Sequence, residues 1–318
     1  MTDKKKWVSG IDLGGTKTLI VAKTKEGEVL DKLVFKTDAK EGPEPVFQHI
    51  EKTLLGLTEK LKAPPSAIGI GVAGQIDKKE GKLLFGPNLG WKEVDIKEKL
   101  KKFNCPITVL NDVRAATLGE WKYGSGKGFS NLACIFIGTG IGGGFVTDGK
   151  LLEGANNSAG EIGHMVVDMN GPKCTCGNFG CLEAFAGGWA IAENARQLIK
   201  KHPEKGKRIL ELAKDDILGI DGKIIIKAYN EKDPLATIVI ELAIKALTAG
   251  VLSIIHAVNP SLLIFGGGIV DGLPDIVTKV EKEVRLRGLN SALSNLSFKK
   301  AALEKEAVAI GATVPFIN

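Results

Sequence analysis

The sequence predicts an α/β protein built from two copies of one structural unit. Its 318 residues are enough for two domains with sizeable cores. Short apolar strands alternate with helical stretches along the chain, as in proteins that cover a sheet with helices. A run of strand, glycine turn, strand, hairpin turn and strand begins at residue 8 and again at residue 132. We therefore expect a duplicated α/β unit with a cleft between the copies.

The first copy opens with an apolar strand at residues 8–12, which ends at the glycine turn 14–17. Further strands are expected at residues 18–23, 29–37, 67–72 and 107–110. Helical periodicity predicts helices over residues 45–61, 94–103 and 115–122.

The second copy repeats the opening pattern with strand 132–137, glycine turn 138–144 and strands 145–147 and 150–152. A later strand at residues 262–265 runs into a glycine triplet, and helices are expected over residues 187–200, 234–256 and 273–287. The apolar stretch 238–258 contains Glu241, Lys245 and His256. These polar residues predict an amphipathic helix and not a membrane span.

The charge pattern argues against nucleic acid as a partner. The net charge is +6, but the lysines are scattered and aromatic residues make up only 6% of the chain. The basic N-terminus lacks the apolar core of a signal peptide. Five cysteines, mostly in one cluster, fit a reducing compartment better than a disulfide framework. We therefore expect a cytoplasmic protein with no nucleic-acid or membrane partner.

The first glycine turn has the composition of an anion-binding loop. Glycines let backbone N–H groups converge on a phosphate, and a neighbouring hydroxyl and ammonium group add donors. The carboxylate at the end of the preceding strand is placed to hold a hydrated Mg²⁺ beside the phosphates. The candidate nucleotide-binding residues are Asp12, Gly14, Gly15, Thr16 and Lys17. A plain hairpin turn is the alternative.

The second glycine turn contains the pattern G-x-G-x-x-G. In a dinucleotide-binding fold this pattern opens a helix, whereas here it leads into a strand and a hairpin. We interpret it as a second phosphate-binding turn, with a purely structural turn as the alternative. Its candidate residues are Gly138, Thr139, Gly140, Gly142 and Gly143. The later triplet Gly266, Gly267 and Gly268 allows either close approach of a flat ring such as adenine or tight strand-to-helix packing.

Asn111 and Asp112 follow an apolar strand, at the end where α/β proteins bind ligands. The carboxylate of Asp112 can accept a proton from a substrate hydroxyl, as the catalytic aspartate of other kinases does. The amide of Asn111 can donate to and accept from sugar hydroxyls. Because a helix is expected to follow, an N-cap role for Asp112 is the alternative.

Cys174, Cys176 and Cys181, with His164 before them, supply a Cys₃His set that suits tetrahedral Zn²⁺. Four protein ligands close the coordination shell, so the expected metal is structural. Reduced thiols packed in a core are the alternative, although the surrounding loop is polar.

Two acidic residues flank this cluster. Glu161 lies one helical turn before His164, and Glu183 lies two residues after Cys181. The ion is thus expected to fix two carboxylates and an imidazole around one polar pocket. The alternative is that both glutamates are solvated surface residues.

Several motifs together resemble those of the ROK family of sugar kinases and repressors. They are IDLGGTK, VLNDVRAA, IGTGIGGG, GEIGHM and CTCGNFGCLEAFAGG, and GPNLGW resembles the glucokinase branch. The resemblance implies a duplicated, actin-like (RNase H-type) fold with an interdomain cleft. A smaller N-terminal domain would comprise residues 1–113 and 302–318, and a larger domain with the zinc loop residues 114–301.

The resemblance also implies transfer of the γ-phosphoryl group of ATP to the 6-hydroxyl of glucose, with Mg²⁺ and a structural Zn²⁺. Asp112 would be the general base. The glycine turns would face the phosphates, and the triplet 266–268 would lie near the adenosine. The implied sugar-binding residues are Gly74, Asn88, Asn111, Asp112, Glu161, His164 and Glu183.

Alternatives to a glucokinase are a kinase for mannose, fructose or N-acetylglucosamine, since a sequence does not reveal pocket shape. A sugar-sensing repressor is less favoured, because the stretch before the first glycine turn is too short for a DNA-binding domain. Many relatives are dimers, so a homodimer is expected.

Overall fold

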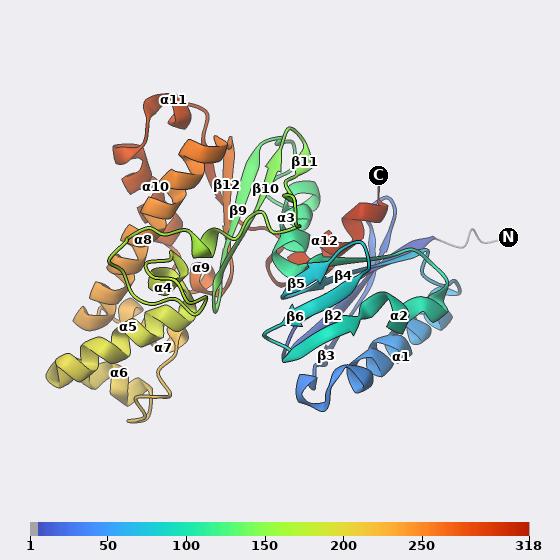
Figure 1. The fold of residues 1–318 in the computed structure, drawn as a ribbon, viewed down its shortest axis with the longest axis horizontal. Helices are drawn as coiled ribbons and strands as arrows, with labels where there is room; N and C mark the ends of the chain where they lie inside the picture. Colours follow the sequence, from blue (N-terminus) through green and yellow to red (C-terminus); the bar gives the residue numbers. More distant parts are fainter. Residues whose placement is uncertain (1–5, 318) are drawn as a thin grey trace. The chain divides into compact units, whose positions relative to one another are not determined.

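The structure, a computed structural model, describes residues 6–317 and shows two compact units (Figure 1). Within the described residues, unit 1 runs to Gly128 and adds Glu153–Asn157 and the segment from Ala302 onward, and unit 2 is the remainder. The predicted division after residue 113 differs from these units at helix α3 (Asp112–Tyr123). This helix stays in unit 1 because it packs against α12 (Ala307–Thr313).

Unit 1 is built on a five-stranded mixed sheet. Its strands are β1 (Trp7–Leu13), β2 (Lys17–Thr24), β3 (Val29–Lys36), β4 (Ala67–Val72) and β8 (Ile107–Asn111). The spatial order is β3-β2-β1-β4-β8. The first three strands pair antiparallel, and β1, β4 and β8 run parallel. The carboxyl ends of these three parallel strands therefore meet at one edge of the sheet.

Unit 2 repeats this topology. Its strands are β9 (Leu132–Ile137), β10 (Ile141–Thr147), β11 (Lys150–Leu151), β12 (Leu262–Gly266) and β13 (Ser297–Lys300). The order β11-β10-β9-β12-β13 has the same antiparallel and parallel pairs in the same places. The predicted duplication of an α/β unit is confirmed.

One face of the unit 1 sheet is an apolar core. Alternate residues of β1 point to this face, where Trp7 and Ile11 are fully buried. They belong to one cluster with Ile50 and Leu54 of α1 (Pro43–Leu61). The apolar residues on one face of α1 therefore pack against the alternate residues of β1 that point to this side of the sheet.

Glycines line the other face of the same sheet and let α12 come close. A Cβ atom at Gly10 of β1 would lie 1.9 Å from the carbonyl oxygen of Ala309, and one at Gly69 of β4 would lie 1.8 Å from that of Ala312. Such distances exclude any side chain. Part of the high glycine content thus serves helix-to-sheet packing and not ligand binding.

A small antiparallel sheet follows β4 and was not predicted. Its strands are β5 (Gln75–Asp77), β6 (Lys82–Gly86) and β7 (Trp91–Asp95). The helix predicted over residues 94–103 is therefore wrong at its start. The carboxylate of Asp95 accepts a hydrogen bond from the N–H of Glu98 at 3.0 Å, and this cap begins α2 (Ile96–Leu100). A 3-10 turn (Lys101–Phe103) follows.

Unit 2 contains more helices than the sequence pattern predicted. The α-helices of unit 2 are α4 (Glu183–Ala186), α5 (Gly188–Lys201), α6 (Lys207–Leu212), α7 (Gly222–Asn230), α8 (Pro234–Val258), α9 (Gly268–Gly272), α10 (Ile276–Arg287) and α11 (Asn290–Leu293). The helix predicted over residues 273–287 begins later, because α9 occupies the preceding turn. Figure 1 shows α5, α6 and α7 (yellow) next to one another.

Helix α8 has the length and apolar composition of a membrane-spanning helix, the one such helix among residues 6–317. In this structure it contacts α4, α5, α7 and α10, and 56% of its most apolar window is buried inside the protein. Buried helices of large cores have the same composition, so we interpret α8 as the central core helix of unit 2.

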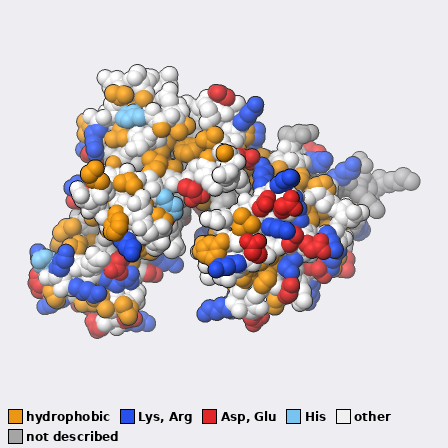
Figure 2. Space-filling view, viewed as in Figure 1, with side chains coloured by type: hydrophobic (Ala, Val, Ile, Leu, Met, Phe, Trp, Pro, Cys, Tyr) orange, Lys and Arg blue, Asp and Glu red, His pale blue; other side chains and the backbone are white. Residues whose placement is uncertain are grey.

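Charged side chains of both signs are interspersed on the face of unit 1 that Figure 2 shows. Charged residues of unit 1 are also paired: Lys60 lies 2.7 Å from Asp31, and Lys32 lies 2.6 Å from Glu306. These pairs are exposed, and each contributes little to stability. The excess of lysine is thus partly balanced locally within unit 1.

Candidate active site

The first glycine turn closes the hairpin between β1 and β2. The N–H of Gly14 donates to the carbonyl oxygen of Lys17 at 3.2 Å, and Leu13 pairs with Thr18. A Cβ atom at Gly15 would lie 2.3 Å from the carbonyl oxygen of Asn88, so only glycine fits. The hairpin interpretation thus describes the local fold correctly. It is compatible with anion binding, since Thr16 and Lys17 remain exposed.

Two carboxylates lie at the carboxyl edge of the parallel strands in unit 1. Asp12 is near the end of β1, and Asp112 follows β8 directly. Burial and, to a smaller extent, the negative charge of Asp112 together raise the pKa of Asp12 to about 7, although Lys17 opposes the shift. The strand order therefore brings together two acidic groups that the sequence separates by a hundred residues.

Asn111, and not Asp112, caps helix α3. The side-chain oxygen of Asn111 accepts a hydrogen bond from the N–H of Arg114 at 3.3 Å. The side-chain nitrogen of Asn111 donates to the carbonyl oxygen of Gly74 at 3.3 Å. The alternative in which Asp112 is the N-cap is therefore wrong. Asp112 lies in the first turn of the helix, where the helix dipole favours an ionised carboxylate.

The second glycine turn is shorter than predicted. β10 begins at Ile141, and Gly142 and Gly143 pair with β9 residues in an antiparallel ladder. The prediction of a turn through residue 144 is wrong, because the ladder continues through these glycines. The turn proper is Gly138–Gly140, closed by a hydrogen bond of 2.9 Å from the N–H of Gly138 to the carbonyl oxygen of Gly140.

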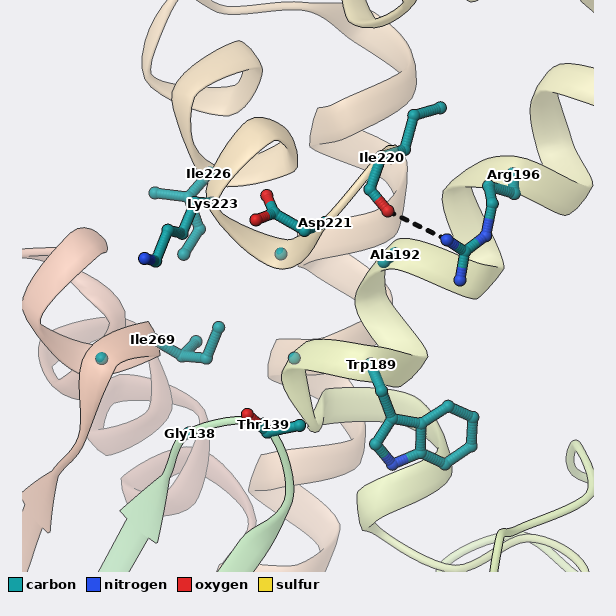
Figure 3. Close-up of a pocket in the computed structure, with 13 residues that line it drawn as sticks. Gly138, Thr139, Trp189, Ala192, Arg196, Ile220, Asp221, Lys223, Ile226 and Ile269 are labelled. Atoms are coloured by element: carbon teal, nitrogen blue, oxygen red, sulfur yellow. Dashed lines mark hydrogen bonds between the residues drawn. The ribbon is translucent and has the colours of Figure 1, made fainter. Parts of the chain in front are cut away.

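Beside this turn lies a cavity of about 500 Å³ in unit 2 (Figure 3). Three chain segments besides the turn form it: the beginnings of α5, α7 and α9. Aliphatic, aromatic and basic side chains all contribute. The lining residues are Gly138, Thr139, Gly188, Trp189, Ala192, Arg196, Ile220, Asp221, Gly222, Lys223, Ile226, Gly268 and Ile269.

The three glycines after β12 have different surroundings. Cβ atoms at Gly266 and Gly267 would lie 2.9 Å from Phe136 and 2.5 Å from the carbonyl oxygen of Ile137, so both glycines serve tight packing. Gly268 has open space around its Cα and lines the cavity. The packing interpretation thus describes Gly266 and Gly267, and approach of a flat ring at Gly268 stays a prediction.

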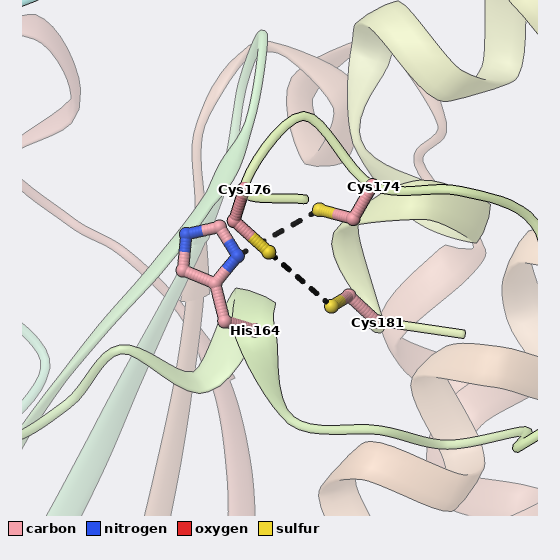
Figure 4. A group of neighbouring side chains, drawn as sticks. All are labelled: His164, Cys174, Cys176 and Cys181. Atoms are coloured by element: carbon pink, nitrogen blue, oxygen red, sulfur yellow. Dashed lines mark hydrogen bonds between the residues drawn. The ribbon is translucent and has the colours of Figure 1, made fainter. Parts of the chain in front are cut away.

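The predicted metal ligands converge in unit 2 (Figure 4). The ligand atoms of His164, Cys174, Cys176 and Cys181 all lie within 4.8 Å of one another. The sulfur atoms of Cys176 and Cys181 are 3.7 Å apart, and Nδ1 of His164 is 3.8 Å from the sulfur of Cys174. A tetrahedral Zn²⁺ with bonds of about 2.3 Å to sulfur separates its ligands by about 3.8 Å. The four residues therefore fit zinc.

Because Nδ1 of His164 faces the sulfur atoms, its Nε2 points away from the cluster (Figure 4). His164 ends the 3-10 helix Ile162–His164, whose N-cap is Glu161, so one helical turn joins the two residues as predicted. The side chains of both residues are exposed. Their polar groups are therefore available to a ligand from solvent.

Glu183 has partners that the sequence did not reveal. One carboxylate oxygen accepts from the N–H of Ile141 at 2.8 Å, and the other accepts from the indole N–H of Trp189 at 3.1 Å. Glu183 is half-buried, so it is not the solvated surface residue of the alternative interpretation. Trp189 itself was not predicted as a site residue; it follows the motif CTCGNFGCLEAFAGG directly.

The repeated sheet, with a glycine hairpin after the first strand of each unit, defines an α/β protein of the actin-like ATPase class. The chain belongs to the ROK family, which it matches over residues 8–317. A glucokinase of Thermotoga maritima is 36% identical over 262 residues, 82% of this chain and 81% of that protein. A xylose repressor of Caldicellulosiruptor bescii is 30% identical over 98% of this chain and 78% of its own length.

The fold agrees with a solved structure of the same family. The ROK family glucokinase from Streptomyces griseus, crystallised with glucose and AMPPNP, superposes with a TM-score of 0.78 at 31% identity. The comparison covers 96% of this chain and 97% of that one. The predicted family and fold class are confirmed.

Proposed function

We propose that this protein is an ATP-dependent sugar kinase that phosphorylates glucose on its 6-hydroxyl group. The observation that carries the proposal is the meeting of Asp12 and Asp112 beside the first glycine turn. Phosphoryl transfer needs one group to accept the hydroxyl proton and positive charge near the phosphates. Relatives named glucokinase, such as the one from Thermotoga maritima, favour glucose as the sugar.

Asp112 is the general base in this proposal. Because Asn111 caps α3, the carboxylate of Asp112 is not needed for capping. An Asp at this position takes the proton of the 6-hydroxyl group as the oxygen attacks the γ-phosphorus and the bond to the ADP leaving group breaks. Positioning the hydroxyl in line supplies much of the rate enhancement.

The cavity of unit 2 is the proposed nucleotide site. The isoleucines at positions 220, 226 and 269 offer apolar surface to an adenine ring, and Lys223 adds a positive charge. Helices α5 and α7 begin at the cavity, and the N–H groups of Gly188 and Trp189 at the start of α5 hold the glycine turn through the carbonyl oxygens of Gly138 and Thr139. The glycine turn 138–140 borders the cavity and supplies backbone donors there, and the turn 14–17 is the proposed phosphate-binding turn of unit 1.

Two metal ions, Mg²⁺ and Zn²⁺, are part of the proposed function. We assign Asp12 to Mg²⁺, because burial and the charge of Asp112 both raise the pKa of Asp12, and a cation would stabilise its ionised form. When bound, Mg²⁺ neutralises charge on the phosphates. His164, Cys174, Cys176 and Cys181 would hold Zn²⁺, which would stiffen the loop; with four protein ligands it would have no position for an activated water.

The sugar-contacting residues that the family resemblance implies remain proposals. They are Gly74, Asn88, Asn111 and Asp112 in unit 1, and Glu161, His164 and Glu183 in unit 2. The amide of Asn111 is already fixed by its bonds to Gly74 and Arg114, so it enters the complex preorganised. Homodimerisation and a cytoplasmic location stay predictions from the sequence.

The experiment is an ADP-release assay of the zinc-loaded protein with Mg²⁺, ATP and four hexoses: glucose, mannose, fructose and N-acetylglucosamine. We expect the highest kcat/KM for glucose. A higher kcat/KM for another hexose would change the assigned substrate and leave the proposed phosphoryl transfer unchanged. Sugar binding by calorimetry without any ADP release would instead support a sugar sensor, as in the xylose repressor relative.

A further inference from the structure

Trp189 contacts both the metal cluster and the proposed nucleotide cavity. Its side chain packs against the buried group formed by Cys174, Cys181 and Ala184. The same residue lines the cavity, next to Thr139 (Figure 3). Its backbone N–H donates to the carbonyl oxygen of Thr139 at 3.1 Å. One side chain therefore separates two of the four metal ligands from the nucleotide site.

Glu183 joins this tryptophan to the second glycine turn. It accepts from the indole N–H of Trp189 through Oε1 and from the backbone N–H of Ile141 through Oε2. A Cβ atom at Gly140 would lie 2.4 Å from Oε2, so the carboxylate is seated directly on the turn. Hydrogen bonds to an ionised acceptor are stronger than neutral ones. The position of the turn thus depends on where Glu183 is held.

The position of Glu183 depends in turn on the metal ligand Cys181, through backbone hydrogen bonds of the residues around them. Leu182, between them, donates its N–H to the carbonyl oxygen of Met165 at 2.8 Å, next to the metal ligand His164. The N–H of Ala184 donates to the carbonyl oxygen of Cys181 at 2.9 Å. An ion that fixes Cys181 and His164 therefore fixes the start of α4, from which Glu183 projects.

We propose that Glu183 and Trp189 are positioning residues that couple metal occupancy to nucleotide affinity. Zinc orders the start of α4, Glu183 holds Ile141 and Trp189, and these two residues set the shape of the glycine turn and of the cavity wall. The inference rests on the proposed function, because it takes the cavity as the nucleotide site. It gives Glu183 a function toward the nucleotide in addition to any contact with sugar.

The first test measures binding of ADP by calorimetry, without sugar, to the zinc-loaded wild type and to Glu183→Gln with full zinc content. The amide of glutamine offers one acceptor oxygen where the carboxylate offers two, so one of the two N–H donors loses its partner. We expect ADP affinity to fall about tenfold. Unchanged ADP affinity in a zinc-loaded Glu183→Gln protein would overturn the proposal, whatever happens to glucose binding.

The second test compares zinc-loaded and zinc-stripped protein. We expect stripping to weaken ADP binding about tenfold in the wild type, and by less than about threefold in Trp189→Phe, where the link is already broken. Trp189 is the one tryptophan of unit 2, so stripping should change the emission of the wild type and not of Trp189→Phe. Trp121→Phe, a tryptophan removal in unit 1, is the matched control and should behave as wild type.

The outcomes separate this inference from the function it rests on. If zinc-loaded wild type binds ADP and phosphorylates glucose, but neither zinc nor the two substitutions changes ADP affinity, the coupling is wrong and the function stands. If the zinc-loaded wild type binds no ADP, the nucleotide site and the coupling both fail. A zinc-stripped protein that unfolds leaves the Glu183→Gln result as the deciding one.

Discussion

At the scale of single residues, the neighbours Asn111 and Asp112 have different roles: Asn111 is structural, and Asp112 is the proposed general base. Asn111 makes both structural bonds, one to the start of α3 and one to Gly74. Asp112 lies one residue later in the first helical turn, facing the charge of Asp12. A short side chain on a capped helix has little freedom to move. This rigidity suits the role of general base that we propose for Asp112.

Asp112→Asn should reduce kcat at least ~100-fold, because an amide cannot accept the proton of the sugar hydroxyl. Glucose affinity should change by less than about threefold, since the amide keeps the shape and most hydrogen bonds. Steady-state kinetics and calorimetry measure the two effects. Asp95→Asn, at the N-cap of α2, is the matched control for kinetics. Loss of glucose binding in a folded Asp112→Asn protein would assign the carboxylate to binding instead.

Asp12 should make the stability of the magnesium-free protein depend on pH. Its pKa is about 7 in the folded state, above the ordinary value of 3.8, so folding favours the protonated form. The contribution is complete below about pH 4 and is lost as pH rises towards 7. With allowance for partial solvent exposure, the loss is of the order of 1–2 kcal/mol.

Asp12→Asn should remove this dependence. Urea unfolding at several pH values between 4.5 and 8, in magnesium-free buffer, gives the free energy of unfolding for both proteins. We expect the variant to be relatively more stable at pH 8 and to lose that advantage toward pH 4.5. Parallel pH profiles for variant and wild type would show that Asp12 is not the titrating group.

Cys176→Ala should lose the metal and weaken glucose binding about tenfold, because His164 is then no longer held by an ion. Elemental analysis gives the zinc content, and calorimetry gives the affinity. Cys105→Ala in unit 1, outside the cluster, should keep both. A metal-free variant with wild-type glucose affinity would separate the metal from the sugar site.

At the scale of elements, the packing of α12 explains why glycines recur in the parallel strands. Gly69→Ala would place a methyl group 1.8 Å from the carbonyl oxygen of Ala312. We expect a loss of about 3 kcal/mol or more in the free energy of unfolding, measured in urea. Gly56→Ala, on the exposed side of α1 with open space around it, should instead gain about 0.5–1 kcal/mol. Similar effects at both positions would contradict the packing account.

Local patterns predicted most of the sheet strands and long helices, and distant contacts decided the rest. β4 and β9 were predicted at their observed bounds, because each is a short apolar run that is followed by a glycine within two residues. α12 was missed, since its sequence AVAIGAT is short and finds its place through Gly10 and Gly69 far away in the chain. β5 has only three residues and pairs with β6 across a turn, so it carries no period of its own.

At the scale of the whole molecule, the two copies of the sheet have diverged in function. Each has a hairpin turn of glycines after its first strand. In unit 1 that turn lies beside two carboxylates, and in unit 2 it lies beside a cavity and a metal cluster. The proposed base and the proposed nucleotide site therefore belong to different units.

The distribution of the site residues along the chain explains which of them the sequence could predict. The four metal ligands and the pair Asn111 and Asp112 stand out because their chemistry is concentrated in short motifs. The cavity is formed by residues from four separate segments; Gly138, Thr139 and Gly268 were predicted from their glycine turns, whereas the side chains from α5 and α7 carry no motif. Trp189 and Lys223 could not be recognised before the fold placed them together.

The account depends most on transfer of phosphate to one hydroxyl of glucose. The most direct measurement is the NMR spectrum of the product formed from ATP, Mg²⁺ and glucose, with 6-deoxyglucose run in parallel. We predict glucose 6-phosphate as the product, and binding of 6-deoxyglucose without phosphoryl transfer. Phosphate on any other hydroxyl, or turnover of 6-deoxyglucose, would contradict the geometry in which Asp112 serves the 6-hydroxyl group.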